Sequence, residues 1–99
     1  MQVSLETSGG IAVLEVDVAG EPPVESTDIH WSKGNNEFTI DNNKRIFPAN
    51  SNKWLVVRNY TLEDSGTYHI AISRGRENQA LASTHINFVV VGKYNSVIV

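Results

Sequence analysis

The stretch Leu62-Glu63-Asp64-Ser65-Gly66-Thr67-Tyr68 leads directly into residues 67–73, a run in which apolar and polar residues alternate. Aspartate, serine and glycine in succession are typical of turns. A period of two is the pattern of a β-strand that buries one face. We therefore expect a turn that opens a strand, with Tyr68 and Ile70 directed toward the core and His69 directed away from it.

The same short alternation recurs along the whole chain, and clusters rich in Gly, Asn, Asp, Ser and Pro separate the runs. No run shows a sustained helical period, so the pattern predicts an all-β sandwich. The expected strands are residues 3–5, 11–18, 28–33, 37–40, 44–47, 54–57, 67–73 and 81–91.

Length and composition indicate one folded domain. A chain of 99 residues has room for a single core, and 40% hydrophobic with 19% charged residues is ordinary for a folded protein. The net charge of -3 provides no basic surface for nucleic acid. No apolar stretch approaches the ~20 residues that span a bilayer, so we expect no direct membrane contact. The domain is expected over residues 1–91, with a C-terminal tail or a linker to a following domain in residues 92–99.

Asp64, Gly66 and Tyr68 together resemble the D-x-G-x-Y motif of immunoglobulin domains. In that family the tyrosine buries its ring and returns its hydroxyl to the backbone, as a tyrosine corner. Arg45 is similar to the arginine that pairs with the motif's aspartate, so the resemblance implies a structural ion pair between Arg45 and Asp64. The implied fold is an immunoglobulin-like β-sandwich of two antiparallel sheets with Greek-key connections. An extra strand at residues 37–40 favours the V or I type over the constant type, and leaves V and I both open.

Trp31 resembles the family's core tryptophan, and its place before the motif favours this fold over fibronectin type III domains. Leu55 and Val57 resemble the inward pair of a later strand. The chain has no cysteine, and Val16 and Ile70 stand where the family's bridging cysteines would be. A lost disulfide costs about 2–5 kcal/mol, and each buried aliphatic side chain recovers about 1.5–3 kcal/mol. We therefore expect Val16 and Ile70 to pack against Trp31 in place of the disulfide.

The sequence offers little for chemistry, because it contains no G-x-S-x-G motif, no P-loop and no cysteine nucleophile. We expect neither enzymatic activity nor a cofactor. His30, His69 and His85 face away from the core on strands that share one sheet in the implied fold. His30 and His69 would lie about two residue pairs apart, or roughly 10 Å, which is too far for a shared metal ion. We therefore expect no metal site.

The outward residues His30 and Ser32, and those of the strands at 67–73 and 81–91, carry no fixed charge. Interface cores are depleted of charge, whereas an ordinary solvated face with few lysines is the alternative explanation. The resemblance implies that this face binds a partner, as it does in many immunoglobulin-like recognition domains. The predicted protein-binding residues are His30, Ser32, His69, Ala71, Ser73, Leu81, Ser83 and His85.

The opposite sheet carries a second candidate interface, formed by Trp54 and Val56, which point outward if their neighbours point inward. An exposed tryptophan is a common anchor in interfaces, although the stems of Lys53 or Arg58 could cover it. Asn59 begins the sequon Asn-Tyr-Thr and is the predicted glycosylation site.

These observations favour an extracellular protein-recognition and adhesion module of a cell-surface receptor. Its partner is another protein, and the same domain on an opposing cell is one candidate. The chain is similar to cysteine-free domains of invertebrate adhesion and allorecognition receptors. The alternative is a structural I-type domain of a giant intracellular muscle-type protein, with a cytoplasmic location. The missing cysteines favour the alternative, whereas the sequon and the charge-poor face favour the receptor.

Overall fold

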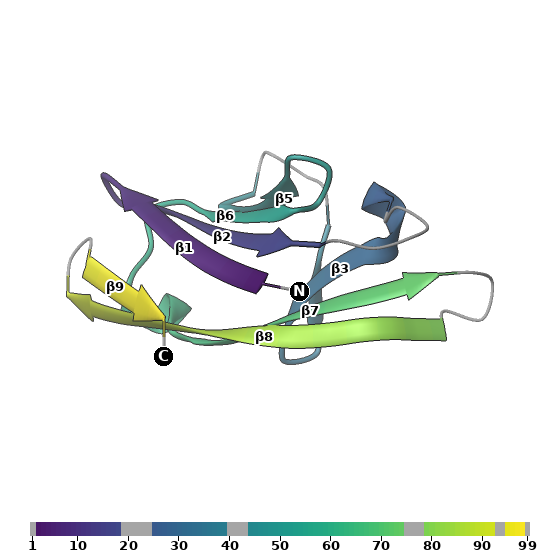
Figure 1. Cartoon of the computed structure of the whole chain (residues 1–99). Helices are drawn as coiled ribbons and strands as arrows, with labels where there is room; N and C mark the ends of the chain where they lie inside the picture. The colour runs from purple at the N-terminus through teal and green to yellow at the C-terminus, as the bar shows by residue number, and fades with distance from the viewer. Residues whose placement is uncertain (1, 19–24, 40–43, 75–78, 93–94, 99) are drawn as a thin grey trace.

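The computed structural model describes residues 2–18, 25–39, 44–74, 79–92 and 95–98, with the backbone alone for residues 74, 79–81, 92 and 95–98. Two antiparallel sheets lie face to face (Figure 1). The first sheet has the order β1 (Gln2–Ser8), β2 (Ile11–Asp17), β6 (Trp54–Val57) and β5 (Ile46–Ala49). The second has the order β4 (Asn36–Phe38), β3 (Ile29–Lys33), β7 (Gly66–Arg74), β8 (Gln79–Gly92) and β9 (Asn95–Ile98).

The order of the strands confirms the predicted sandwich. The chain passes from the first sheet to the second between β2 and β3, returns between β4 and β5, and crosses again between β6 and β7. Two short 3-10 turns, η1 (Ser26–Asp28) and η2 (Leu62–Asp64), precede β3 and β7. Within the ranges given above, no helix is long and apolar enough to cross a membrane.

Each of the eight expected strands has a counterpart, and the bounds of every strand except β6 differ from the expected ones by one to three residues. β4 covers Asn36–Phe38 instead of residues 37–40, although residues 40–43 lie outside the described part of the chain. β5 begins at Ile46, two residues later than expected, because Ile46 lies opposite Val57, the last residue of β6. The expected tail or linker contains β9, which pairs with the end of β8 and contacts β1 (Figure 1).

Alternating side chains from both sheets form one core. Trp31 is 1% exposed, and it packs in the same buried cluster as Val16 and Ile70, at 3% and 0%. Ile70 lies directly opposite Trp31 in the pairing of β3 with β7. The apolar surface that these three side chains bury occupies the place of the absent disulfide. The structure also buries the predicted inward pair, Leu55 and Val57, at 0% each.

A hydrogen bond to the β5–β6 loop satisfies the polar group of the core tryptophan. The indole Nε1 of Trp31 donates to the backbone oxygen of Asn52 at 2.6 Å. The side-chain amide of Asn52 in turn donates to the backbone oxygen of Ser26 at 2.8 Å. A buried N–H without an acceptor would be costly, so this loop and the core depend on one another.

The stretch that opens β7 forms a tyrosine corner. The Tyr68 hydroxyl donates to the backbone oxygen of Asp64 at 2.6 Å, and the ring of Tyr68 is fully buried. The Asp64 carboxylate caps η2 by accepting from the backbone N–H of Thr61 at 2.8 Å. Arg45 donates to both carboxylate oxygens of Asp64, at 2.8 Å each, so it ties the start of β5 to the start of β7.

Candidate protein-binding face

The outward side chains of β3, β7 and β8 form two rows across the sheet. Pairing of the strands aligns Ser32, His69 and His85 in the first row. The second row consists of His30, Ala71 and Ser83. We call these six residues the recognition face. None of the six carries a fixed charge, and all are exposed or half-buried.

Two of the predicted binding residues lie beyond these rows. Ser73 is half-buried and follows an irregularity in the pairing of β7 with β8, which sets it opposite Ala80. Leu81 lies on the backbone of β8, but its side chain is outside the described part of the structure.

A shallow pocket of about 410 Å³ lies on one side of the recognition face. Four of the residues that line it are predicted protein-binding residues, and three belong to the turn and the strand that follow β3. A flat sheet with such a hollow can accept a protruding side chain from a partner. The lining residues are His30, Ser32, Gly34, Asn35, Glu37, Ala71 and Ser73.

Glu37 is a residue of this face that the sequence argument missed. It lies opposite Ser32 in the pairing of β3 with β4, so it extends the first row by one charged position. Its Oε1 is 2.8 Å from Nδ1 of His30. Both side chains are exposed, at 58% for Glu37 and 38% for His30, which limits the stability that this contact contributes. The recognition face is therefore neutral in its centre and acidic at its β4 edge.

The register of the strands sets the positions of the three histidines, of which the sequence argument had compared only His30 and His69. His30 lies opposite Ala71, two residues from His69 along β7, so these two are separated as expected. His69 and His85, however, lie directly opposite one another, with ring centroids 6.3 Å apart. Among the residues that the structure describes, no three His, Asp or Glu side chains gather closely enough to hold a metal ion.

The second candidate interface is larger than Trp54 and Val56. Trp54 is 37% exposed, and the guanidinium of Arg58 lies over Phe47, 4.6 Å from the ring centroid, rather than over the tryptophan. Val13 and Phe47 flank Val56 on the two neighbouring strands. Alternation along residues 11–18 already indicates that Val13 faces outward, whereas placing Phe47 beside Val56 requires the register.

Asn59, the predicted glycosylation site, is exposed and lies just beyond β6. Its backbone has a φ of 50°, a left-handed conformation that asparagine tolerates better than most residues. The chain can therefore turn here so that Tyr60, which follows, is buried in the core.

The tyrosine corner contains two acidic groups whose pKa values are shifted, Asp64 and Tyr68. Burial alone would raise the pKa of Asp64, but the hydrogen bonds from Arg45 and from the Thr61 backbone hold it below its usual range. Burial, with the nearby charge of Asp64, raises the pKa of Tyr68 to about 12. Near neutral pH Asp64 is therefore charged and Tyr68 is neutral, and both side chains are buried within the corner.

Comparison with known proteins identifies the family to which this arrangement belongs. A search of the curated proteins finds no match to this chain. The model of the immunoglobulin I-set domain matches residues 3–87, from the first strand to the middle of β8. That match covers most of the chain, and the structure shows the two antiparallel sheets of the fold. The chain therefore belongs to the immunoglobulin I-set family.

Proposed function

We propose that this domain is an extracellular recognition and adhesion module of a cell-surface receptor, which binds a protein partner through the recognition face. I-set domains are protein-interaction or structural modules in general, and they are generally not enzymes. The observation that carries the proposal is the neutral centre of the recognition face. Six aligned side chains on three strands lack fixed charge, so a flat protein surface can approach without desolvating an ion.

The form of the proposal that we test is homophilic binding between opposing cells. Beads coated with the domain should aggregate, and His69→Glu or Ala71→Arg should suppress aggregation because each adds a charge to the centre of the face. Matched controls place the same charges at Leu62, which is 67% exposed on η2 and lies outside both sheet faces. Leu62→Glu and Leu62→Arg should leave aggregation unchanged.

Two results would count against homophilic binding. The first is that beads coated with the original domain stay dispersed. The second is that they aggregate equally well with the face variants. Thermal melting of every variant provides the folding control, because substitutions at exposed or half-exposed positions should change stability by less than about 0.5 kcal/mol.

A structural module inside the cell is the second candidate, and the absence of cysteine favours it. A domain that closes its core with Val16 and Ile70 needs no oxidising compartment to fold. Antibody staining of live cells that express the full-length protein separates the candidates. Labelling of intact cells supports the receptor, whereas labelling only after permeabilisation supports the intracellular module. Occupancy of Asn59 by a glycan would also support the receptor.

A further inference from the structure

The outward face of the β1–β2–β6–β5 sheet carries a continuous apolar stripe. Residues beside it along β2 and β6, such as Leu14 and Leu55, are fully buried, so the alternate positions face outward. Two members of the stripe are among the exposed large hydrophobic residues, Ile11 at 43% and Trp54 at 37%. The other members are half-buried. We define the apolar stripe as Ile11, Val13, Phe47, Trp54 and Val56.

One row of the sheet shows how charge flanks the stripe. Across the four strands, pairing aligns Glu6 on β1, Val13 on β2, Val56 on β6 and Phe47 on β5. The guanidinium of Arg58 lies over the Phe47 ring at 4.6 Å from its centroid. The row therefore begins with an exposed carboxylate at the β1 edge and ends with a guanidinium at the β5 edge.

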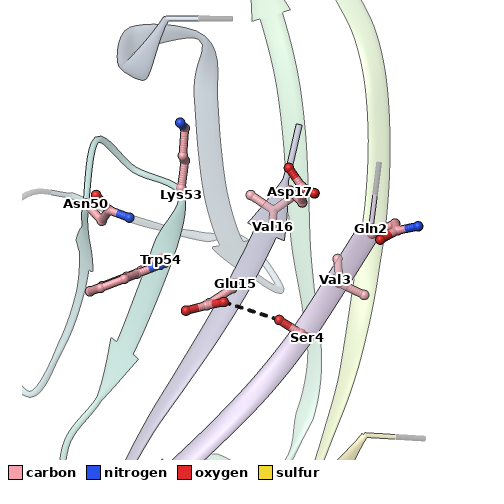
Figure 2. Close-up of a pocket in the computed structure, with 9 residues that line it drawn as sticks. All are labelled: Gln2, Val3, Ser4, Glu15, Val16, Asp17, Asn50, Lys53 and Trp54. Atoms are coloured by element: carbon pink, nitrogen blue, oxygen red, sulfur yellow. Dashed lines mark hydrogen bonds between the residues drawn. The ribbon is translucent and has the colours of Figure 1, made fainter. Parts of the chain in front are cut away.

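The residues next to that row have the same polarity. Figure 2 shows Glu15 and Asp17 on β2, Ser4 beside Glu15 on β1, and Trp54 and Lys53 on the other side of β2. Glu15 lies directly opposite Trp54 in the pairing of β2 with β6. These residues line a shallow pocket of about 380 Å³. Carboxylates thus lie on the β1–β2 half of the face, and cations lie on the β5–β6 half.

This distribution of charge is complementary to itself under one symmetry operation. A two-fold axis parallel to the strands, between β2 and β6, places β1 of one copy over β5 of the other. Glu6 then meets the Arg58 that covers Phe47, while the apolar stripes face one another. A two-fold axis perpendicular to the strands would instead place Glu6 over Glu6, which is repulsive. Closed dimers use self-complementary patches, and packed sheets keep their strands nearly aligned.

We propose that two copies of this domain pack face to face through the apolar stripe, about a two-fold axis parallel to the strands, with Glu6 of each copy paired to Arg58 of the other. Trp54, at one end of the stripe, is the anchor, because a large aromatic side chain that becomes buried on binding is the kind of residue that supplies most of the binding energy in interfaces. This dimer is independent of the recognition face. It leaves both recognition faces on its outer sides, where each can bind a further partner.

A charge exchange tests the proposed axis. Glu6→Arg and Arg58→Glu should each weaken self-association at least about tenfold, because each places two like charges together at two sites. Mixing the two variants in equal amounts should restore a heterodimer, since both contacts then pair opposite charges. Sedimentation equilibrium on the separate and mixed variants measures these changes. The protein is expressed in bacteria, because a glycan on Asn59 would stand beside Arg58.

Controls make the result specific to this face. Glu63→Arg makes the same change of charge at an exposed position on η2, and it should leave the dimer intact. Trp54→Thr should abolish dimerisation while the melting temperature stays close to that of the original protein. Repeating the series in an Ala71→Arg background separates this interface from the recognition face.

Three outcomes would overturn the proposal. They are a monomer at the highest soluble concentration, a dimer that Trp54→Thr leaves unchanged, and folded single variants that remain monomeric when mixed. None of the three depends on whether the recognition face binds a partner.

Discussion

The carboxylate of Asp64 is a nearly buried charge, 4% exposed, at the point where three segments meet. It accepts two hydrogen bonds from Arg45 and one from the backbone of Thr61, while its own backbone oxygen accepts from Tyr68. Hydrogen bonds to an ionised group are the stronger kind, and a buried charge without them would be destabilising. The motif that is visible in the sequence therefore joins η2 to the starts of β5 and β7.

Stability in acid should depend on this carboxylate. Its pKa in the folded state lies below the usual 3.8, so the unfolded chain binds the proton more readily. The stabilisation is therefore present above about pH 4 and is lost as the pH falls through the folded-state pKa. We expect Asp64→Asn to lower the free energy of unfolding at pH 7 by about 1.5–3 kcal/mol.

Urea denaturation between pH 7 and pH 2 measures this effect. The free energy of unfolding of the original protein should fall more steeply below pH 4 than that of Asp64→Asn, which has no proton to gain at this position. Parallel curves for the two proteins would show that Asp64 does not control the acid sensitivity. Glu37→Gln, which changes an exposed carboxylate, is the control and should resemble the original protein.

At the scale of the elements, the hairpin loop between β5 and β6 has an unusual backbone. Asn50, Ser51 and Asn52 all have positive φ, at 49°, 55° and 63°. The loop keeps this shape because Asn52 accepts from Trp31 and donates to Ser26, and because Lys53 accepts from the backbone of Val16 at 2.9 Å. Left-handed conformations suit asparagine, whereas for serine they cost about 1–2 kcal/mol.

Ser51→Gly should therefore stabilise the domain. Glycine adopts positive φ without a steric penalty, and part of that gain is offset by its greater freedom in the unfolded chain. We expect the free energy of unfolding to rise by about 0.5–1 kcal/mol. Ser51→Val, which places a β-branched residue at the same φ, should lower it. Thermal and urea unfolding of the two variants measure the difference, and an ordering with valine above glycine would contradict this explanation.

The elements themselves were largely predictable, because each strand buries one face and shows this as a period of two. β9 was not, since a strand of four residues at the sheet edge carries little pattern and is defined by its pairing with β8. The shifted start of β5 has a similar cause. Lys44 and Arg45 lie in a bend, and the side chain of Arg45 reaches Asp64, which is distant in the sequence.

For the molecule as a whole, stability depends on a core that packing alone closes, since there is no cysteine to cross-link it. Ile70→Ala should lower the free energy of unfolding by about 2–5 kcal/mol, because it leaves a cavity beside Trp31. Val91→Ala removes an aliphatic side chain that is 62% exposed, and it should change stability by less than about 0.5 kcal/mol. Urea denaturation compares the two. A loss below 1 kcal/mol for Ile70→Ala would show that the sheets are held together elsewhere.

The outward faces of the two sheets are two separate surfaces that differ in charge and in apolar content. The recognition face is neutral with one acidic edge, and the opposite face combines an apolar stripe with carboxylates on one side and cations on the other. A dimer through the stripe would present two recognition faces, and two linked sites bind more tightly than one when both can be engaged.

The sequence by itself, through its resemblance to immunoglobulin domains, predicted the sandwich, the buried residues Val16, Trp31 and Ile70, and the pairing of Arg45 with Asp64, while it left V type and I type open. These features can be read from local alternation and from one compact motif, because burial restricts the type of residue at each core position. Only the tertiary structure decided which outward residues are neighbours. The register between strands brings Glu37 to the recognition face, places His69 opposite His85, and sets Glu6 and Arg58 at opposite ends of one apolar row. Core packing does not restrict the residue types at outward positions, so the sequence pattern does not show which of them are neighbours. That depends on how strands from distant segments pair.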